Sequence, residues 1–203
     1  MKVLYLTRRL REEEANTEHI KNLAQYLVDK NHEVFVVSFD DGSDYSIDRR
    51  VEVNRVNLPF EADNLYNWSM MLNNELKREA RERFEDRGFD VIHVIDWTSI
   101  PGGVTLSQHL DIPLVITFQS TENERGFNSD QSGVISELEW QGGYEADKVF
   151  ATGEDTKNSL LFDLDVPSEK LEVINPFSSD WQGTVLNSYK ELVKQEKEVK
   201  QYR

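Results

Sequence analysis

The stretch FDVIHVIDWTSIPGGVTLSQHLDIPLVITFQSTENER, residues 89–125, decides the fold of this chain. It contains two almost unbroken apolar runs, residues 90–95 and 112–118, which is the pattern of strands covered on both faces. Residues 98–110, between the runs, are too few to add a hairpin strand and enough for a crossover helix. This strand–helix–strand pattern predicts that the two strands are parallel.

Polar residues follow both predicted strands at the point where each strand ends. Asp96 and Trp97 follow the first strand, and residues 119–122 (Gln-Ser-Thr-Glu) follow the second. Parallel strands bring their carboxyl ends to one edge of the sheet, and ligands of open α/β sheets bind at that edge. We therefore expect these groups to lie in a ligand cleft.

The loop over residues 119–126 combines hydroxyl, amide, carboxylate and guanidinium groups. Such a mixture suits a polyhydroxylated ligand, because each hydroxyl can donate and accept hydrogen bonds. An ordinary capped connection between a strand and a helix would also explain the loop. The residues alone leave both interpretations open.

Alternating strand and helix patterns continue through the rest of the chain. Further strands are predicted at residues 2–7, 33–38, 51–56, 148–152 and 171–174. Further helices are predicted over residues 16–30, 63–87, 129–144, 156–162 and 181–194, followed by a fraying polar tail at 195–203. This alternation predicts one α/β domain: a Rossmann-like, doubly wound, mainly parallel sheet with helices on both faces.

Capping residues and apolar stripes define the predicted helices. The expected caps are Asn16 or Thr17, Asp63 or Asn64, and Ser129 or Asp130. The expected stripes are Leu65, Trp68, Leu72, Leu76 and Phe84 in one helix, Ile135, Leu138, Trp140 and Tyr144 in another, and Trp181, Val185, Leu186, Tyr189, Leu192 and Val193 in the last. The last stripe is too large to leave exposed, so residues 177–203 should pack back on a domain formed by residues 1–176.

Composition limits the functions that the chain can have. It has 203 residues, no cysteine and a formal net charge of −15, from 38 acidic and 23 basic residues. Such a surface repels nucleic acid and anionic lipid, so neither nucleic acid nor a membrane is expected as a partner. The acidic excess indicates either ordinary solubility or adaptation to high salt, and we favour a halophile. Without a signal peptide or a long apolar run, the expected location is the cytoplasm.

Familiar catalytic and metal-binding motifs are absent from the sequence. The four histidines lack ligand spacing, so no metal site is expected, and His93 inside an apolar strand is best interpreted as a core residue. The pairs Gly102-Gly103 and Gly142-Gly143 lack the further glycines of a phosphate loop. Close packing of helices on the sheet explains both pairs.

Several of these stretches together resemble the amino-terminal domain of GT-B glycosyltransferases, above all the retaining glycogen synthases and related archaeal enzymes. The matching stretches are residues 90–97, 112–118, Ser120-Thr121-Glu122 with Glu139-Trp140, 144–149, 32–34 and 170–174. The resemblance covers residues 1–175.

The resemblance implies a fold, an activity and a site. Members of this family have two Rossmann-like domains across a cleft; the first binds the acceptor and the second binds most of the nucleotide-sugar. Glucosyl transfer proceeds with retention, and neither a metal nor another cofactor is implied. The acceptor-cleft residues are then those already expected from the sheet edge and the polar loop: Asp96, Trp97, Gln119, Ser120, Thr121, Glu122 and Arg125.

The sequence departs from the family pattern in three places. Gln119 replaces a histidine that contacts the transferred sugar, and an amide cannot carry charge. The glycine pair that brings backbone N–H groups to the donor phosphates is replaced, leaving a vestigial donor loop of Glu14, Ala15, Asn16 and Thr17 beside two further glutamates. After Asn175-Pro176 the sequence passes directly to the final helix, where the family continues into its donor domain.

These departures lead to one main hypothesis and two alternatives. The main hypothesis is a stand-alone acceptor-type domain that does not catalyse transfer by itself and binds a glycan or a partner glycosyltransferase chain. The first alternative is the acceptor-binding half of an active hexosyltransferase, completed by a separate donor-binding domain. The second is a chain deliberately shortened to its first domain.

Overall fold

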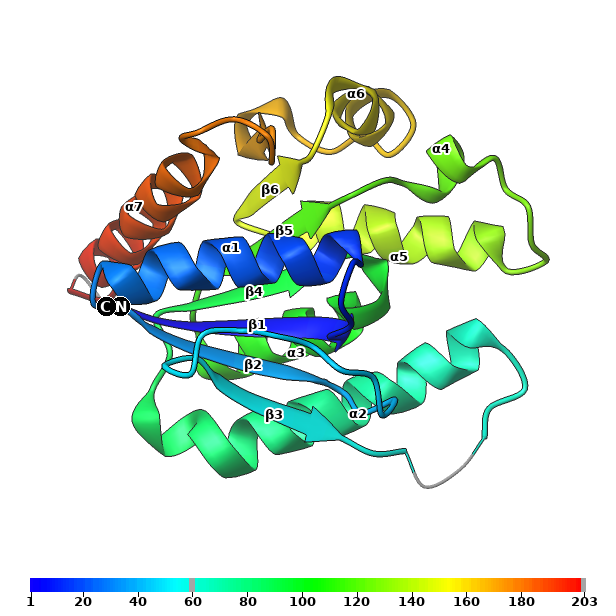
Figure 1. The fold of residues 1–203 in the computed structure, drawn as a ribbon. Coiled ribbons are helices and arrows are strands. Elements are labelled where there is room, and N and C mark those ends of the chain that lie inside the picture. Colours follow the sequence, from blue (N-terminus) through cyan, green and yellow to red (C-terminus); the bar gives the residue numbers. More distant parts are fainter. Residues whose placement is uncertain (59–60, 202–203) are drawn as a thin grey trace.

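The computed structural model describes residues 1–58 and 61–201, and Figure 1 shows its parallel sheet between two layers of helices. The strands run in the order β3-β2-β1-β4-β5-β6-β7, with every neighbouring pair parallel. Their bounds are β1 Lys2–Arg9, β2 Glu33–Phe39, β3 Glu52–Val56, β4 Val91–Ile95, β5 Leu114–Phe118, β6 Lys148–Ala151 and β7 Leu171–Val173. The predicted Rossmann-like, doubly wound sheet is therefore confirmed.

Helices cover both faces of the sheet. The helices are α1 Ala15–Asp29, α2 Leu65–Phe84, α3 Ile100–Leu110, α4 Glu122–Arg125, α5 Ser132–Glu145, α6 Glu154–Phe162 and α7 Trp181–Gln201, with short 3-10 turns η1 Glu85–Arg87, η2 Trp97–Ser99 and η3 Ser168–Lys170. Helices α1 and α7 bury one face of the strands, and residues of α2, α3, α5 and α6 bury the other. The strands contribute alternate side chains to the two cores, which explains their almost unbroken apolar runs.

The final helix α7 packs back on the sheet, as its apolar stripe predicts. Trp181, Val185 and Tyr189 are buried in the core that they share with α1. The Tyr189 hydroxyl lies 3.1 Å from the Tyr5 hydroxyl and is hydrogen-bonded to Nδ1 of His93. The returning helix joins the end of the chain to the first strand of the sheet.

His93 is a satisfied core histidine. Its Nε2 lies 2.8 Å from the Thr117 hydroxyl, so both ring nitrogens have partners. Burial, with a smaller contribution from His19, lowers the pKa of His93 well below its ordinary value, and the ring is neutral at pH 7.

The expected fraying after residue 194 is wrong, because α7 continues to Gln201. Two i, i+4 ion pairs, Lys194 with Glu198 and Lys200 with Glu196, support the extra turns. The Lys200 ammonium also donates to the carbonyl oxygen of Asp111 at 2.6 Å, which ties the end of α7 to the end of α3. Residues 202 and 203 lie outside the described chain.

Helix starts differ from the predicted caps in two of three cases. Asn64 accepts from the Asn67 N–H at 2.8 Å and caps α2 as predicted. Helix α1 instead begins after Glu14, because the Thr17 hydroxyl accepts from the Arg11 N–H in the preceding loop. Helix α5 begins after Gln131 rather than after Ser129 or Asp130.

The predicted stripes of α2 and α5 need correction. Leu65 is exposed, and the side chain of Phe84 lies outside the described residues. Trp140 and Tyr144 are also exposed, because α5 turns its glycines to the core instead. A Cβ on Gly142 would lie 2.6 Å from the Ile100 side chain, and one on Gly103 would overlap Val94. Gly103 thus allows α3 to pack closely on the sheet as predicted, whereas Gly142 allows close contact between α5 and α3 rather than with the sheet.

Candidate functional site at the carboxyl edge of the sheet

The central strands end level with one another. Thr7 of β1 pairs with Ile95 of β4, which pairs with Thr117 of β5. The residues that follow these strands therefore lie side by side along one edge. Asp96 is fixed there by its own N–H, which donates to the Thr117 carbonyl at 2.9 Å.

Asp96 adopts a backbone conformation that is unusual for a residue with a side chain. Its φ is 68° and its ψ is 165°, a region that is almost confined to glycine. Its Oδ1 accepts from the Trp97 N–H at 2.9 Å, which caps η2. Backbone strain of this kind persists where the surrounding structure over-determines it, and it is concentrated at functional sites.

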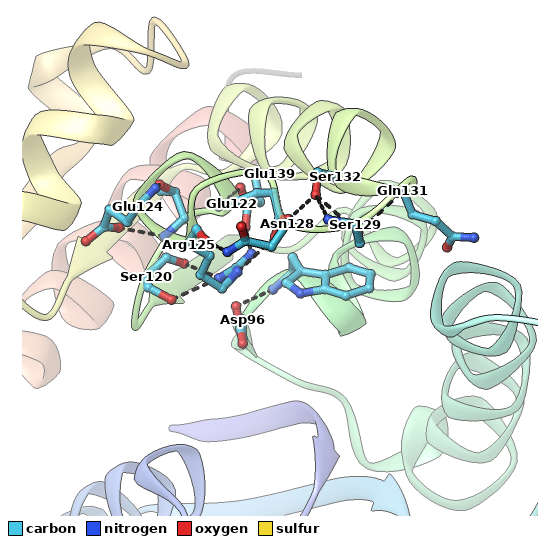
Figure 2. A network of polar contacts seen from close by, with 12 residues as sticks. Asp96, Ser120, Glu122, Glu124, Arg125, Asn128, Ser129, Gln131, Ser132 and Glu139 are labelled. Atoms are coloured by element: carbon cyan, nitrogen blue, oxygen red, sulfur yellow. Dashed lines mark hydrogen bonds and ion pairs between the residues drawn. The ribbon is translucent and has the colours of Figure 1, made fainter.

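Arg125 is the centre of a polar network beside Asp96. Figure 2 shows its guanidinium between Ser120 on one side and Glu122 and Glu139 on the other. Its Nε donates to Glu122 at 2.9 Å, its Nη2 to Glu139 at 2.6 Å, and its Nη1 to the Ser120 hydroxyl at 2.9 Å. This arrangement holds the guanidinium plane in one orientation.

Glu139 is a carboxylate placed on the buried face of α5. Its side chain is 0% exposed, and its Oε2 accepts from the Glu122 N–H at 2.7 Å. Burial raises its pKa to about 7, although the Glu122 N–H and Arg125 favour the charged form. Burial likewise raises the pKa of Asp96, against the Trp97 N–H and the charge of Arg125. With a pKa of about 7, the Glu139 carboxyl can take up or release a proton near neutrality.

The predicted acceptor-cleft residues divide into two groups. Thr121 and Glu122 are buried and support the loop: Thr121 caps α4 and lies 2.7 Å from the Ser159 hydroxyl, while Glu122 accepts from Ser132. Trp97 is only 5% exposed and belongs to the core on the side of α2. Ser120, Asp96 and Arg125 are partly accessible and lie together.

Gln119 is half-buried at the end of β5, where the resemblance expects a histidine. Its carbonyl oxygen accepts from Thr152 at 3.3 Å and from Thr156 at 3.4 Å. Within the described part of the chain its side-chain amide makes no hydrogen bond, so the amide is available to a ligand.

The loop of residues 8–14 before α1 is not purely acidic; of the predicted donor-loop residues, Glu14 ends this loop, and Ala15, Asn16 and Thr17 lie in the first turn of α1. Residues 8–14 contain three arginines and three glutamates, so their formal charges cancel. The Glu14 carboxylate is paired with Arg9 rather than directed freely into the cleft. Glu13 has a φ of 64°, the left-handed conformation that glycine adopts most easily. The tight turn into α1 is thus retained without glycine at that position.

Two residues of this edge were not among the predicted site residues. Glu139 shares the buried face of its helix with Ile135, Leu138 and Gly142, and a charge at such a position signals a buried polar network. Arg8 is the penultimate residue of β1, and its guanidinium carbon lies 5.4 Å from the centre of the Trp68 ring. The sequence signal for Arg8 was its position, because it directly follows the predicted strand at residues 2–7, just as Asp96 follows the predicted strand at residues 90–95.

Two further observations concern ions and membranes. Among the described residues, no three acidic or histidine side chains are arranged to hold a metal ion. None of the helices in residues 1–58 and 61–201 is both long and apolar enough to cross a bilayer.

The fold and the edge together define a class of GT-B-like α/β domains. A solved chain of sucrose-phosphate synthase from Thermosynechococcus elongatus superposes with a TM-score of 0.67 at 13% identity, covering 96% of this chain and 99% of that one. UDP-GlcNAc 2-epimerase from Neisseria meningitidis, solved with UDP-GlcNAc, superposes with a TM-score of 0.60 at 18% identity, covering 97% of this chain and 52% of that one. At such identities the likeness concerns the fold alone.

Sequence comparison places the chain within this class. The sequence model of Glycosyltransferase Family 4 matches residues 17–177, which is most of the chain, and the chain belongs to that family. An uncharacterized glycosyltransferase of Methanocaldococcus jannaschii is 28% identical over 181 residues, covering 86% of this chain and 45% of the relative. The chain thus spans about half the length of this curated relative.

Proposed function

We propose that this domain is the acceptor side of a glycogen synthase-like, retaining GT-B glycosyltransferase and that it binds a glycan at the carboxyl edge. The network that holds Arg125 beside the strained Asp96 is the observation that carries this proposal. It presents fixed donors and acceptors at the edge where α/β domains bind ligands. The free amide of Gln119 adds two donors and one acceptor at the same place.

The same proposal holds that residues 1–203 do not transfer sugar by themselves and that their ligand is a glycan or a partner glycosyltransferase chain. Retaining transfer requires a leaving diphosphate stabilised by N–H groups and cations. Gln119 cannot supply the charge of the family histidine, and the glycine pair before α1 is absent. Within this proposal the domain acts in the cytoplasm of a halophilic archaeon, with no nucleic acid or membrane partner.

A second candidate is the acceptor half of an active hexosyltransferase that lacks only its donor-binding half. The turn into α1 favours it, because Glu13 keeps the left-handed conformation and Glu14 is neutralised by Arg9. The first N–H groups of α1 receive no side-chain cap, so they remain available to an anion. In this case the domain binds a nucleotide-sugar only when the donor half is present.

Calorimetry on the purified chain tests the main proposal. We expect weak binding of maltooligosaccharides, its loss in Gln119→Ala, and its retention in Gln108→Ala, which removes an exposed glutamine on α3. We expect no binding of ADP-glucose or UDP-glucose at millimolar concentration and no transfer to glycogen.

Other outcomes separate the candidates. Turnover by the purified chain alone, abolished by Gln119→Ala, would overturn the non-catalytic proposal and make Gln119 a substitute for the histidine. Turnover that appears only when a donor-domain protein from the native source is added would support the second candidate. A chain that binds no saccharide alone and gains no turnover when the donor-domain protein is added would refute both.

A further inference from the structure

A groove separate from the Arg125 network opens on the α2 side of the same edge. It has a volume of about 380 Å³ and is lined by Arg8, Arg9, Phe39, Ala62, Asn64, Leu65 and Trp68. Among the described residues its walls carry two arginines and no carboxylate, although the chain has 38 acidic and only 23 basic residues. The groove is thus lined by positive charge on a chain with a net negative charge, which favours the binding of an anion there.

Arg8 is the distinctive residue of this groove. The described chain contains four half-buried arginines, and three of them form ion pairs: Arg9 with Glu14, Arg55 with Asp41, and Arg125 with Glu139. Arg8 forms neither an ion pair nor a hydrogen bond within the described residues, and its Nε is buried without a partner. Its guanidinium therefore has unused donors in a place where leaving them unused is costly.

Trp68 holds the Arg8 side chain in position. The guanidinium carbon lies 5.4 Å from the centre of the Trp68 ring, and Phe39 contacts the same ring edge-on at 5.2 Å. A guanidinium fixed against an aromatic ring loses little conformational freedom when it binds an oxyanion. The apolar side chains beside it, Leu65 and Phe39, suit the non-polar face of a sugar ring.

We propose that this groove binds the oxyanion, phosphate or carboxylate, of a charged sugar acceptor, with Arg8 as the residue that recognises it. The proposal rests on the proposed acceptor function and narrows it to an acidic sugar. Planar guanidinium groups match phosphate and carboxylate oxygens in a two-pronged geometry that neutral hydroxyls do not reproduce. Arg9 lines the same wall, but its charge is compensated by Glu14 and Asp41, so Arg8 carries the recognition.

Several carboxylates lie near Arg8 but outside the walls of the groove. Glu14 and Asp41 are engaged by Arg9, and Glu61 and Asp63 line an adjacent hollow rather than this groove. Glu14, Asp96 and Asp41 all act on Arg8 electrostatically without forming an ion pair with it. The binding of an oxyanion should therefore depend on contact with the guanidinium and not on a general positive field.

Calorimetry with four probes tests the inference: glucose, glucose 6-phosphate, glucuronate and inorganic phosphate. We expect the charged sugars to bind about tenfold or more tightly than glucose, which is the range for a charge-assisted hydrogen bond. Glucose 6-phosphate and glucuronate distinguish a phosphate from a carboxylate as the preferred group. The preference should vanish in Arg8→Gln and persist in Arg11→Gln, which removes an exposed arginine three positions away.

Two further variants check that the loss of binding is not caused by misfolding and that the ligand binds in this groove. Arg8→Lys keeps the charge but loses the planar fork, so it should retain only part of the preference even if Arg8→Gln does not fold. Ligand-induced quenching of tryptophan fluorescence should disappear in Trp68→Phe, which places the ligand in this groove.

Each other outcome has a defined meaning. Equal affinities for glucose and the charged sugars, with binding still lost in Gln119→Ala, would overturn the inference and leave the proposed acceptor function intact. Binding of inorganic phosphate as tight as that of glucose 6-phosphate would overturn recognition of a sugar. An undiminished preference in Arg8→Gln would show that another residue is responsible.

Discussion

Replacing His19 should make the free energy of unfolding fall less steeply as the pH is lowered below neutrality. His19 is a buried residue of α1 whose ring lies 4.6 Å from the ring of Trp181 in α7, and among the described residues neither ring nitrogen has a hydrogen-bond partner. Burial lowers its pKa from 6.5 to about 4. The unfolded chain thus takes up a proton as the pH falls below about 6.5, and the folded chain resists until about pH 4.

The magnitude follows from this difference. A pKa lowered from 6.5 to about 4 corresponds to about 3 kcal/mol of unfolding free energy, lost progressively as the pH falls through that window. His93 contributes in the same direction, and the raised pKa values of Glu139 and Asp96 act in the opposite one. All three groups remain in a His19→Leu variant, and the pKa of His93 loses only the smaller contribution of His19, so most of the difference between the two proteins comes from His19.

Urea denaturation followed by circular dichroism at about pH 7.5, 6.5, 5.5 and 4.5 measures how the free energy of unfolding changes with pH. These values cover most of the range between the pKa of His19 in the unfolded and the folded chain. We expect His19→Leu to be at least as stable as the parent near neutrality, because it removes unsatisfied buried nitrogens. Its stability should then fall less steeply with acid, and His109→Gln, which removes an exposed imidazole, is the matched comparison. Parallel curves for the parent and His19→Leu between pH 6.5 and pH 4.5 would refute the reasoning about the pKa.

Three further predictions concern stability. The excess of 38 acidic over 23 basic residues should make the melting temperature rise from dilute buffer to molar KCl, and a flat or falling curve would contradict adaptation to salt. Trp181→Ala should cost on the order of 3 kcal/mol of unfolding free energy, and an unchanged denaturant midpoint would show that α7 is not docked. Gly142→Ala should destabilise the fold by about 1–3 kcal/mol through its contact with Ile100, whereas Gly133→Ala, in open space on the same helix, should be neutral or stabilising by up to about 1 kcal/mol; equal thermal shifts in the two variants would refute the packing argument.

The sheet could be predicted because its information is local. Each central strand is an apolar run of its own, and the spacing between runs fixes parallel connections. The docking of α7 followed in the same way from a stripe that contains Trp181 and Tyr189. Such features depend on period and length, which a single sequence displays directly.

The site was harder to predict because its contacts join distant segments. Glu139 contacts Arg125 only when α5 packs beside α4. Arg8 and Trp68 are in contact although α1, β2 and β3 lie between them in the sequence. The sequence interpretation considered the glutamates before α1 and left out Arg8, Arg9 and Arg11 in the same loop. The buried face of α5 was misjudged because glycine, without a side chain, carries no apolar signal even where it forms the contact.

The return of α7 to the first strand has a consequence for how the protein is made. The face of the sheet that carries Val3, Tyr5 and Val36 is completed by Trp181 and Tyr189, which leave the ribosome long after the strands. Until then this face is only partly covered by α1, and nascent chains with exposed apolar surface attract chaperones and self-associate. Synthesis that stalls before α7 should therefore yield an aggregation-prone product, even though every strand of the described sheet has already been translated.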